Sequence, residues 1–323
     1  MAGRLLESRD ILRTAATLLP AWDRGRRARV TALRATMEWA LGRYEEATAL
    51  LLRELADHEG QLQPETATLE LGVAVVALRK NDFSTAVDWG ERALRSAERI
   101  GDPPQTTAVR ALLALAHTFA GDARAADHLD PVVEVLDDTE DQELAGQMDT
   151  LVMTGWTEML HGRHDPALRR LRRGLDVSRR TGQSLVLADL FAASASAYLW
   201  LGRLDEAAAY ADDALEAASL VGSGEPRSLA EVVSAAVLMW RGDFVGALKI
   251  CEESLSSAGP APVGDGRDAR PDTAAQRRSG GLCQQGARSG RRPAPARVRS
   301  PGPPDVVPAA GCRGTGRWRR DSR

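Results

Sequence analysis

Apolar residues recur every three or four positions in a series of segments along residues 1–257, and short polar stretches separate the segments. This spacing places the apolar side chains on one face of a helix. Two clear series flank one such break, namely Leu185, Ala188, Ala192 and Ala195 before it and Ala207, Ala211, Leu215 and Ala218 after it. The pattern predicts a succession of helix, turn, helix and loop.

The turns share a six-residue phrase that returns six times at intervals of 39–41 residues. Its first residue can take the left-handed conformation that ends a helix, and an Asp or Glu inside it favours the start of the next. We expect Asp165 to cap the helix in one copy, with Pro166 at the first helical position. The phrases begin at Gly42, Asn81, Gly121, Gly162, Gly202 and Gly242, and Gly60, Gly101, Gly182 and Gly222 are expected to end the second helices.

A second regularity lies seven residues before each turn, where the side chain is always small. These positions hold Ala35, Ala74, Ala114, Gly155, Ala195 and Ala235. Small residues in one phase of successive helices indicate a fixed site of close helix-to-helix contact. The repeat and this register together predict an all-α, right-handed α-solenoid of about six helix pairs.

The phrase and the small residues resemble the tetratricopeptide repeat, and Tyr198-Leu-Trp-Leu-Gly-Arg-Leu-Asp-Glu-Ala207 is the best match. The period exceeds the usual length of about 34 residues, so the helices should be longer than standard. This long variant is similar to the repeat region of large LuxR-type, ATP-binding (MalT-like) transcriptional regulators. The resemblance covers about residues 4–257 and implies a sensor or interaction region.

Composition fits a cytoplasmic helical protein. Ala, Leu, Arg and Glu dominate, and no apolar run approaches the roughly 18 residues that cross a bilayer. The first ten residues carry charges where a secretory signal needs an apolar segment. Of three cysteines, the repeats contain Cys251, which we expect to be buried on an apolar helical face. The sequence gives no basis for assigning a cofactor or a metal.

Residues 258–323 differ in character from those before them. They contain 14 Arg, 11 Gly and 9 Pro, with neither Lys nor Glu. Such a segment buries too little apolar surface to order itself, so we expect a disordered tail after a repeat domain of residues 1–257. The tail carries a net charge of +9 and the repeat domain −12, which the total of −3 conceals.

Two explanations compete for this tail. It is either a basic arm for nucleic acid, or the product of a shifted reading frame in G+C-rich DNA. The abrupt change directly after a well-formed helical segment at 246–255 favours the second explanation. The arm's phosphate contacts would be Arg291, Arg292, Arg297, Arg299, Arg313, Arg317, Trp318, Arg319 and Arg320.

Motifs for catalysis and for nucleotide binding are missing from the sequence. It contains no Gly-x-x-x-x-Gly-Lys-Ser/Thr phosphate loop, no Gly-x-Ser-x-Gly nucleophile motif and no C-terminal helix-turn-helix. We therefore expect binding rather than an enzyme, and contact with DNA only through regulator modules that this chain lacks.

Apolar side chains near the ends of the first helices are the main binding candidates. Two residues before a turn stand Phe119, Leu160, Trp200 and Trp240, and Trp156 shares the helical side of Leu160. First helices line the concave surface of a repeat solenoid, so these side chains are expected to form an apolar floor for a protein or small effector. Core packing between adjacent repeats is the alternative.

Charged clusters provide weaker candidates. An acidic partner or a phosphate would suit the arginines at 169–180, namely Arg169, Arg170, Arg172, Arg173, Arg179 and Arg180, whereas a soluble outer helix pairing with carboxylates such as Asp176 explains them without a ligand. His161 and His164 flank a turn and are expected to be solvated rather than metal-bound. The acidic stretch at 137–143 lacks the ligand spacing of a calcium loop.

The C-terminal end of the solenoid lacks a polar capping helix in this sequence. We expect an apolar face near Val237, Leu238 and Leu248 to be exposed and to mediate self-association. The sequence as a whole predicts a non-catalytic scaffold that binds a protein or an effector and does not insert into a membrane. The alternatives are a free-standing tetratricopeptide adaptor for assembling protein complexes, and a nucleic-acid binder that uses the basic tail.

Overall fold

The computed structural model describes residues 2–20, 22–57, 64–221 and 224–257. Within these ranges the chain forms fourteen helices and no strand. Twelve of them make six consecutive pairs: α2 (Arg24–Ala40) with α3 (Tyr44–Ala56), α4 (Pro64–Arg79) with α5 (Phe83–Ile100), α6 (Pro103–Ala120) with α7 (Ala125–Asp138), α9 (Met148–Leu160) with α10 (His164–Thr181), α11 (Leu187–Trp200) with α12 (Leu204–Val221), and α13 (Gly224–Trp240) with α14 (Phe244–Ser257). The remaining two are α1 (Ala2–Leu18), before the first pair, and the short α8 (Asp141–Leu144), after the third.

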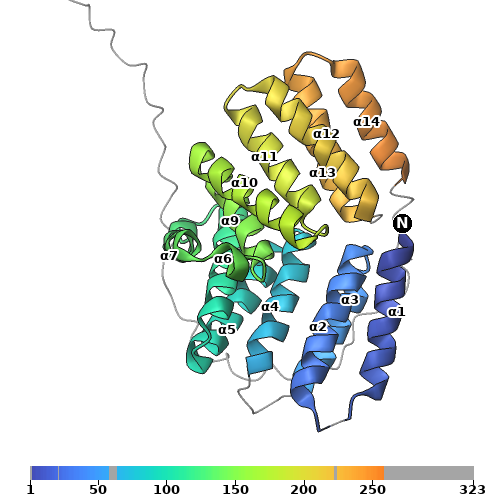
Figure 1. The fold of residues 1–323 in the computed structure, drawn as a ribbon, viewed down its shortest axis with the longest axis vertical. Coiled ribbons are helices and arrows are strands. Elements are labelled where there is room, and N and C mark those ends of the chain that lie inside the picture. Colours follow the sequence, from blue (N-terminus) through green and yellow to red (C-terminus); the bar gives the residue numbers. More distant parts are fainter. Residues whose placement is uncertain (1, 21, 58–63, 222–223, 258–323) are drawn as a thin grey trace, which may run out of the picture. The chain divides into compact units, whose positions relative to one another are not determined.

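The pairs stack one on the next in chain order, as Figure 1 shows. Each pair contacts its successor, for instance through α3 and α4, α5 and α6, and α10 and α11. The prediction of an all-α chain of stacked helix pairs is therefore confirmed. The predicted tail at 258–323 lies outside the described residues.

The turn residues take the conformation that the sequence predicts. Asn81 has a φ of 60°, and the five turn glycines have φ between 70° and 83°. Gly101 and Gly182 end second helices with φ of 75° and 73°, whereas Gly60 and Gly222 lie outside the described residues. A left-handed residue at each of these sites is what allows the chain to reverse so tightly.

The expected cap at Asp165 is wrong. Helix α10 begins at His164 with Arg163 at the N-cap, so Asp165 lies inside the first turn and Pro166 follows it. In this turn the N-cap falls directly after the left-handed Gly162, two residues before Asp165. Asp82 does occupy the N-cap position of its helix, and its carboxylate accepts a hydrogen bond from the Thr85 amide at 3.2 Å.

The small residues seven positions before the turns lie at close helix contacts. All five alanines are at most 8% exposed. At the sixth position, a Cβ added to Gly155 would lie 2.5 Å from Leu171 Cδ2, closer than carbon atoms can approach. The second helix of the pair therefore crosses here over a site with no room for a side chain.

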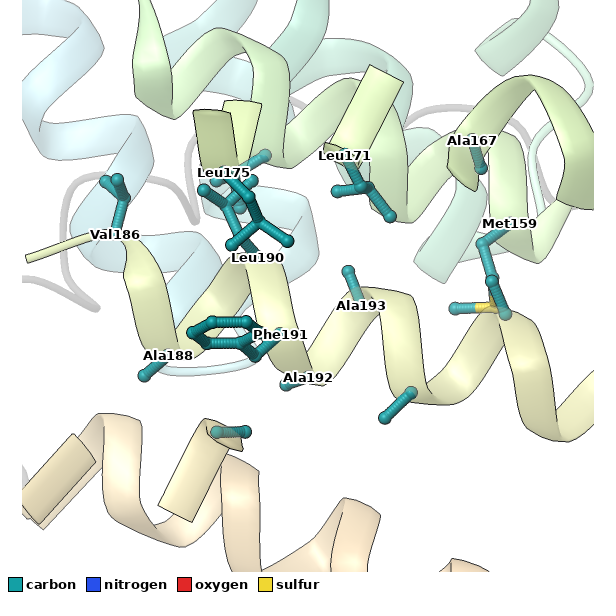
Figure 2. Packing of buried hydrophobic residues seen from close by; sticks show 14 of the residues in the cluster. Met159, Ala167, Leu171, Leu175, Val186, Ala188, Leu190, Phe191, Ala192 and Ala193 are labelled. Atoms are coloured by element: carbon teal, nitrogen blue, oxygen red, sulfur yellow. The ribbon is translucent and has the colours of Figure 1, made fainter. Parts of the chain in front are cut away.

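The largest apolar core runs through the fourth, fifth and sixth pairs. Figure 2 shows Leu171 and Leu175 of α10 pointing toward Leu190 and Ala193 of α11. The predicted apolar series before Gly202 needs one correction, because Leu185 lies in the loop before α11. Its partners in that series, Ala188, Ala192 and Ala195, are buried as expected.

A histidine pair packs between α6 and α7 in the third repeat. The rings of His117 and His128 are parallel within 4°, with centroids 5.4 Å apart. His117 is 1% exposed, and its Nδ1 atom lies 3.4 Å from a carboxylate oxygen of Asp122 without the geometry of a hydrogen bond. Burial lowers the pKa of both imidazoles below the usual value, and Arg124 reinforces this effect at His117.

Candidate functional site: an interior cavity

The first helices of all six pairs contribute to one interior cavity of about 410 Å³. From the second helices of the pairs it receives Leu51 of α3, and Asn81 lines it from a turn. Most of its wall is apolar and includes Ala32, Trp39, Leu71, Val75, Leu115, Val152, Met153 and Trp156. The size and the apolar wall are those of a site for a small ligand.

The sequence register explains which residues reach this cavity. Val75, Leu115 and Trp156 each lie six residues before the turn residue of their own repeat. Lining residues also stand ten positions before a turn, as Leu71 and Val152 do. These positions are three or four residues apart, so they form one face of each first helix.

Early and late repeats meet at one side of the cavity, which is partly open to solvent. Arg79, at the end of α4, donates hydrogen bonds to Glu225 of α13 at 2.7 Å and to Asp189 of α11 at 3.4 Å. These partners are 146 and 110 residues away along the chain. The Arg79 guanidinium also lies over the Trp39 ring, 4.9 Å from its centroid. Contacts between α1 and α12 and between α2 and α13 accompany these interactions.

Carboxylates outnumber basic groups in the cavity wall. The charged lining residues are Arg79, Asp149, Asp189 and Glu225. Asp149 is exposed to solvent, yet the protein around its carboxyl raises the pKa of that group by desolvation; Arg79 opposes this shift and Asp189 adds to it. Burial also raises the pKa of Glu225, although Arg79 opposes the effect. The chamber is therefore apolar with an anionic end.

Nothing in this geometry resembles a catalytic arrangement of nucleophile and base. Among the described residues, no group of three or more His, Cys, Asp or Glu side chains is placed to hold a metal ion. What the arrangement can do is bind. It offers apolar contact to the body of a ligand and unsatisfied oxygen acceptors to its polar end.

Comparisons with known proteins bear on the fold. Neither a known protein family nor a curated protein matches the chain. Among solved structures, a Rap protein complexed with competence and sporulation factor superposes with a TM-score of 0.54 at 12% identity, over 80% of this chain and 77% of that one. A thermophilic TPR protein of Thermus thermophilus has a TM-score of 0.46 at 22% identity, with 69% and 99% covered.

A tetratricopeptide repeat protein of Parabacteroides merdae gives a TM-score of 0.45 at 15% identity, with 80% of this chain and 89% of that one covered. The likeness to the Rap protein shows that the chain shares the fold of that protein, built here from stacked helix pairs. At these identities the likeness concerns the fold alone.

The structure brings together only part of the predicted apolar floor. Phe119 and Trp156 line the cavity, and Phe119 also stacks on Phe83 with centroids 5.1 Å apart. Leu160, Trp200 and Trp240 are not among the lining residues, and they are 41%, 67% and 62% exposed. They are not packed in the core either, so neither interpretation of the sequence describes these three.

These three residues do not reach the cavity because different first helices line it with different parts of their length. The early helices α2 and α4 line it up to their C-terminal ends, whereas α11 contributes Asp189, near its N-terminus. Trp200 lies eleven residues further along α11, about 16 Å at the rise of an α-helix. Residues at equivalent positions of different repeats therefore do not all reach the cavity.

Most of the predicted basic patch is engaged in structural ion pairs. Arg170 is 8% exposed and is held by Glu158 at 3.0 Å and by Asp137, so it does not belong to a surface patch. Arg173 pairs with Asp141 at 2.7 Å and donates to two backbone carbonyls.

The other arginines of this group surround a shallow depression, and several of them also have partners. Arg172 donates to the Tyr198 hydroxyl, Arg179 lies 3.7 Å from Asp176, and Arg180 pairs with Asp141. Arg169 forms no ion pair with another described residue and remains a candidate contact for an acidic partner.

The remaining candidate residues of the sequence have separate outcomes in the structure. His161 forms a 2.9 Å hydrogen bond with the Thr118 hydroxyl, whereas the Nδ1 atom of His164 is buried without a partner. The expectation that Cys251 is buried is wrong, because α14 leaves it exposed. In the described part of the chain, no helix is long and apolar enough to span a membrane.

The predicted apolar C-terminal face is present but composed differently. Val237 is 2% exposed because it packs in the core, which corrects the prediction, and Leu238 is half-buried. The exposed face belongs to α14, where Phe244, Val245 and Leu248 are 67%, 82% and 60% exposed.

Sequence reasoning missed the charged residues of the cavity. A signal for two of them exists, because Asp149 and Asp189 each lie thirteen residues before the turn glycine of their repeat. Thr68 and Leu229 occupy the same register and also line the cavity. A carboxylate at an inward-facing helical position was thus visible in the repeat alignment. No comparable signal exists for Arg79 or Glu225.

Proposed function

We propose that this chain is a non-catalytic binding scaffold whose interior cavity takes a small effector or a short peptide segment. The observation that carries the proposal is the apolar cavity built by the first helices of all six pairs. Burial of apolar ligand surface supplies the affinity, at about 25 cal/mol for each Å² removed from water. The Rap protein with the same fold type, complexed with competence and sporulation factor, supports a binding role.

We further propose that the scaffold is the sensor region of a LuxR-type transcriptional regulator, in a cytoplasmic setting. The long repeat period supports this, and ligand occupancy would then alter modules that lie outside this sequence. A tetratricopeptide adaptor is the second candidate, which the exposed Trp200 and Trp240 favour, since exposed tryptophans are common at protein interfaces. Nucleic-acid binding by the tail stays a separate prediction outside the described residues.

A cavity-filling variant tests the proposal. Val75→Trp inserts an indole into the wall, and Val232→Trp makes the same change at a residue of α13 that is 65% exposed. The probe is the neutral dye N-phenyl-1-naphthylamine, read by its own emission and by energy transfer from Trp39 and Trp156. We expect saturable binding to the unmodified chain, about tenfold weaker binding to Val75→Trp, and no change in Val232→Trp.

Equal affinities in all three proteins would place the dye elsewhere and contradict the cavity as the binding site. Far-ultraviolet circular dichroism of each variant confirms that the helices are retained, so that lost binding is not lost folding.

A further inference from the structure

The cavity wall holds one charged group that the protein itself does not satisfy. Arg79 is shared by Asp189 and Glu225, which leaves Asp149 with neither a hydrogen bond nor an ion pair to another described residue. The second oxygen of Glu225, Oε2, is buried and also lacks a partner. Three carboxylates thus face one guanidinium, and a ligand that complements this wall must bring positive charge.

We propose that the cavity binds a small amphipathic cation, an inference that rests on the proposed function. This ligand has an apolar body and one protonated amine or guanidinium group, which the Asp149 carboxylate holds. Glu225 Oε2 offers a second acceptor at the same anionic end. The apolar body lies along the first helices toward Trp156. Charge-assisted hydrogen bonds are about twice as strong as neutral ones.

Arg79 shows that this wall already holds one organic cation. Its guanidinium rests on the Trp39 ring and donates to two carboxylates. Burial alone would lower its pKa, but Asp189 and Glu225 raise the pKa of Arg79 above its usual value. The two carboxylates therefore favour the protonated form of a group held between them.

The length of the ligand follows from the register on α9. Asp149 and Trp156 both line the cavity and are seven residues apart, which is two turns of one helical face. At the α-helical rise this separation is about 10 Å. A cation separated from an aromatic or branched apolar group by a short alkyl chain spans this distance. The compound 4-phenylbutylamine has this form and serves as the probe.

Calorimetric titration of the full chain with three matched compounds tests the proposal. The amine is compared with 4-phenylbutan-1-ol and 4-phenylbutyrate, which share its apolar body but are neutral and anionic. We expect the amine to bind at least about tenfold more tightly than the alcohol, and the carboxylate to bind most weakly. In Asp149→Asn the amine should fall to the level of the alcohol, while the affinity for the alcohol stays within about twofold.

Asp212→Asn is the control, because Asp212 is an exposed aspartate like Asp149 but lies on α12 outside the cavity. A second readout is proton release: desolvation raises the pKa of Asp149, so at a pH near that pKa binding a cation displaces protons from its carboxyl. Titrations in buffers of different ionisation enthalpy measure this release, and Asp149→Asn should reduce it.

The outcomes separate this inference from the function on which it rests. If the alcohol binds as tightly as the amine, or if the preference for the amine survives in Asp149→Asn, the cation site is refuted while the cavity remains a binding site. If no compound binds the folded chain, both proposals are refuted. Loss of alcohol binding in Val75→Trp ties the measured affinity to the cavity.

Discussion

The contact between Arg79 and the late repeats should stabilise the whole helical array. In a simple solenoid each repeat touches only its neighbours. Arg79 departs from this rule, because its partners Asp189 and Glu225 lie on the fifth and sixth pairs whereas it ends the first helix of the second. The change Arg79→Met keeps the apolar stem on Trp39 and removes the charge.

The expected loss follows from burial. The side chains of Arg79, Asp189 and Glu225 are 22%, 8% and 18% exposed. Removing one partner from a fully buried ion pair costs about 3–5 kcal/mol, and the residual exposure reduces this to about 2–4 kcal/mol. Arg163→Met is the control, since Arg163 lies the same 2.7 Å from Asp130 but the two side chains are 40% and 58% exposed. We expect it to cost less than about 1 kcal/mol.

Urea unfolding followed by far-ultraviolet circular dichroism measures both variants. The loss in Arg79→Met should shrink as the pH falls from neutrality, because Arg79 lowers the pKa of Glu225 and its removal lets burial raise that pKa further. A carboxyl whose folded pKa exceeds its unfolded value destabilises the native state at high pH, and this penalty disappears as it takes up a proton.

Arg79→Met should also broaden the transition, because the early and late repeats would then unfold less cooperatively. The triple variant Arg79→Met, Asp189→Asn, Glu225→Gln removes the stranded charges and should recover more than half of the loss. A loss in Arg79→Met no larger than that in Arg163→Met, with an unchanged transition width, would refute the reasoning.

Two further predictions concern the histidine pair and the last helix. Because burial lowers the pKa of His117 and His128, the unfolded chain binds more protons than the native one as the pH falls through about 6.5, so stability should decrease there. His117→Phe keeps a ring against His128 and should weaken this pH dependence; an identical slope of unfolding free energy against pH would contradict the explanation. Self-association through α14 should raise the mass seen by light scattering as concentration increases, and Phe244→Lys with Leu248→Lys should abolish the rise. An unmodified chain that remains monomeric throughout would exclude it.

The sequence predicts the fold well because each repeat restates the same local rules. A left-handed residue at the turn, such as Asn81, and a small residue seven positions earlier, such as Ala74, identify every helix pair. These are local constraints on backbone conformation and on contact distance, so they can be recognised in the sequence without knowledge of the tertiary structure. The one cap placed wrongly, at Asp165, fails by a shift of two residues within such a turn.

The position of the cavity could not be predicted as well from the sequence, because it depends on how the packing angles between successive repeats add up. Treating Phe119 and Trp200 as equivalent assumes that successive first helices are related by translation alone. In the structure Phe119 lines the cavity near the end of α6, whereas α11 reaches the cavity with Asp189 near its beginning. That displacement is the sum of many small packing angles, and no residue in the sequence records it.

The contact between early and late repeats and the proposed cation site share a carboxylate, that of Glu225. Glu225 contributes Oε1 to Arg79 and leaves Oε2 without a partner, while Asp149 faces the same chamber unpaired. Asp189 of α11 repels both Glu225 and Asp149, and this repulsion opposes the contact that Arg79 makes between the early and late repeats. A bound cation would relieve that repulsion and so would stabilise the contact between the early and late repeats; by linkage, that contact would strengthen binding of the cation. Occupancy of the cavity would thereby be transmitted to both ends of the repeat array through the ion pairs of one arginine.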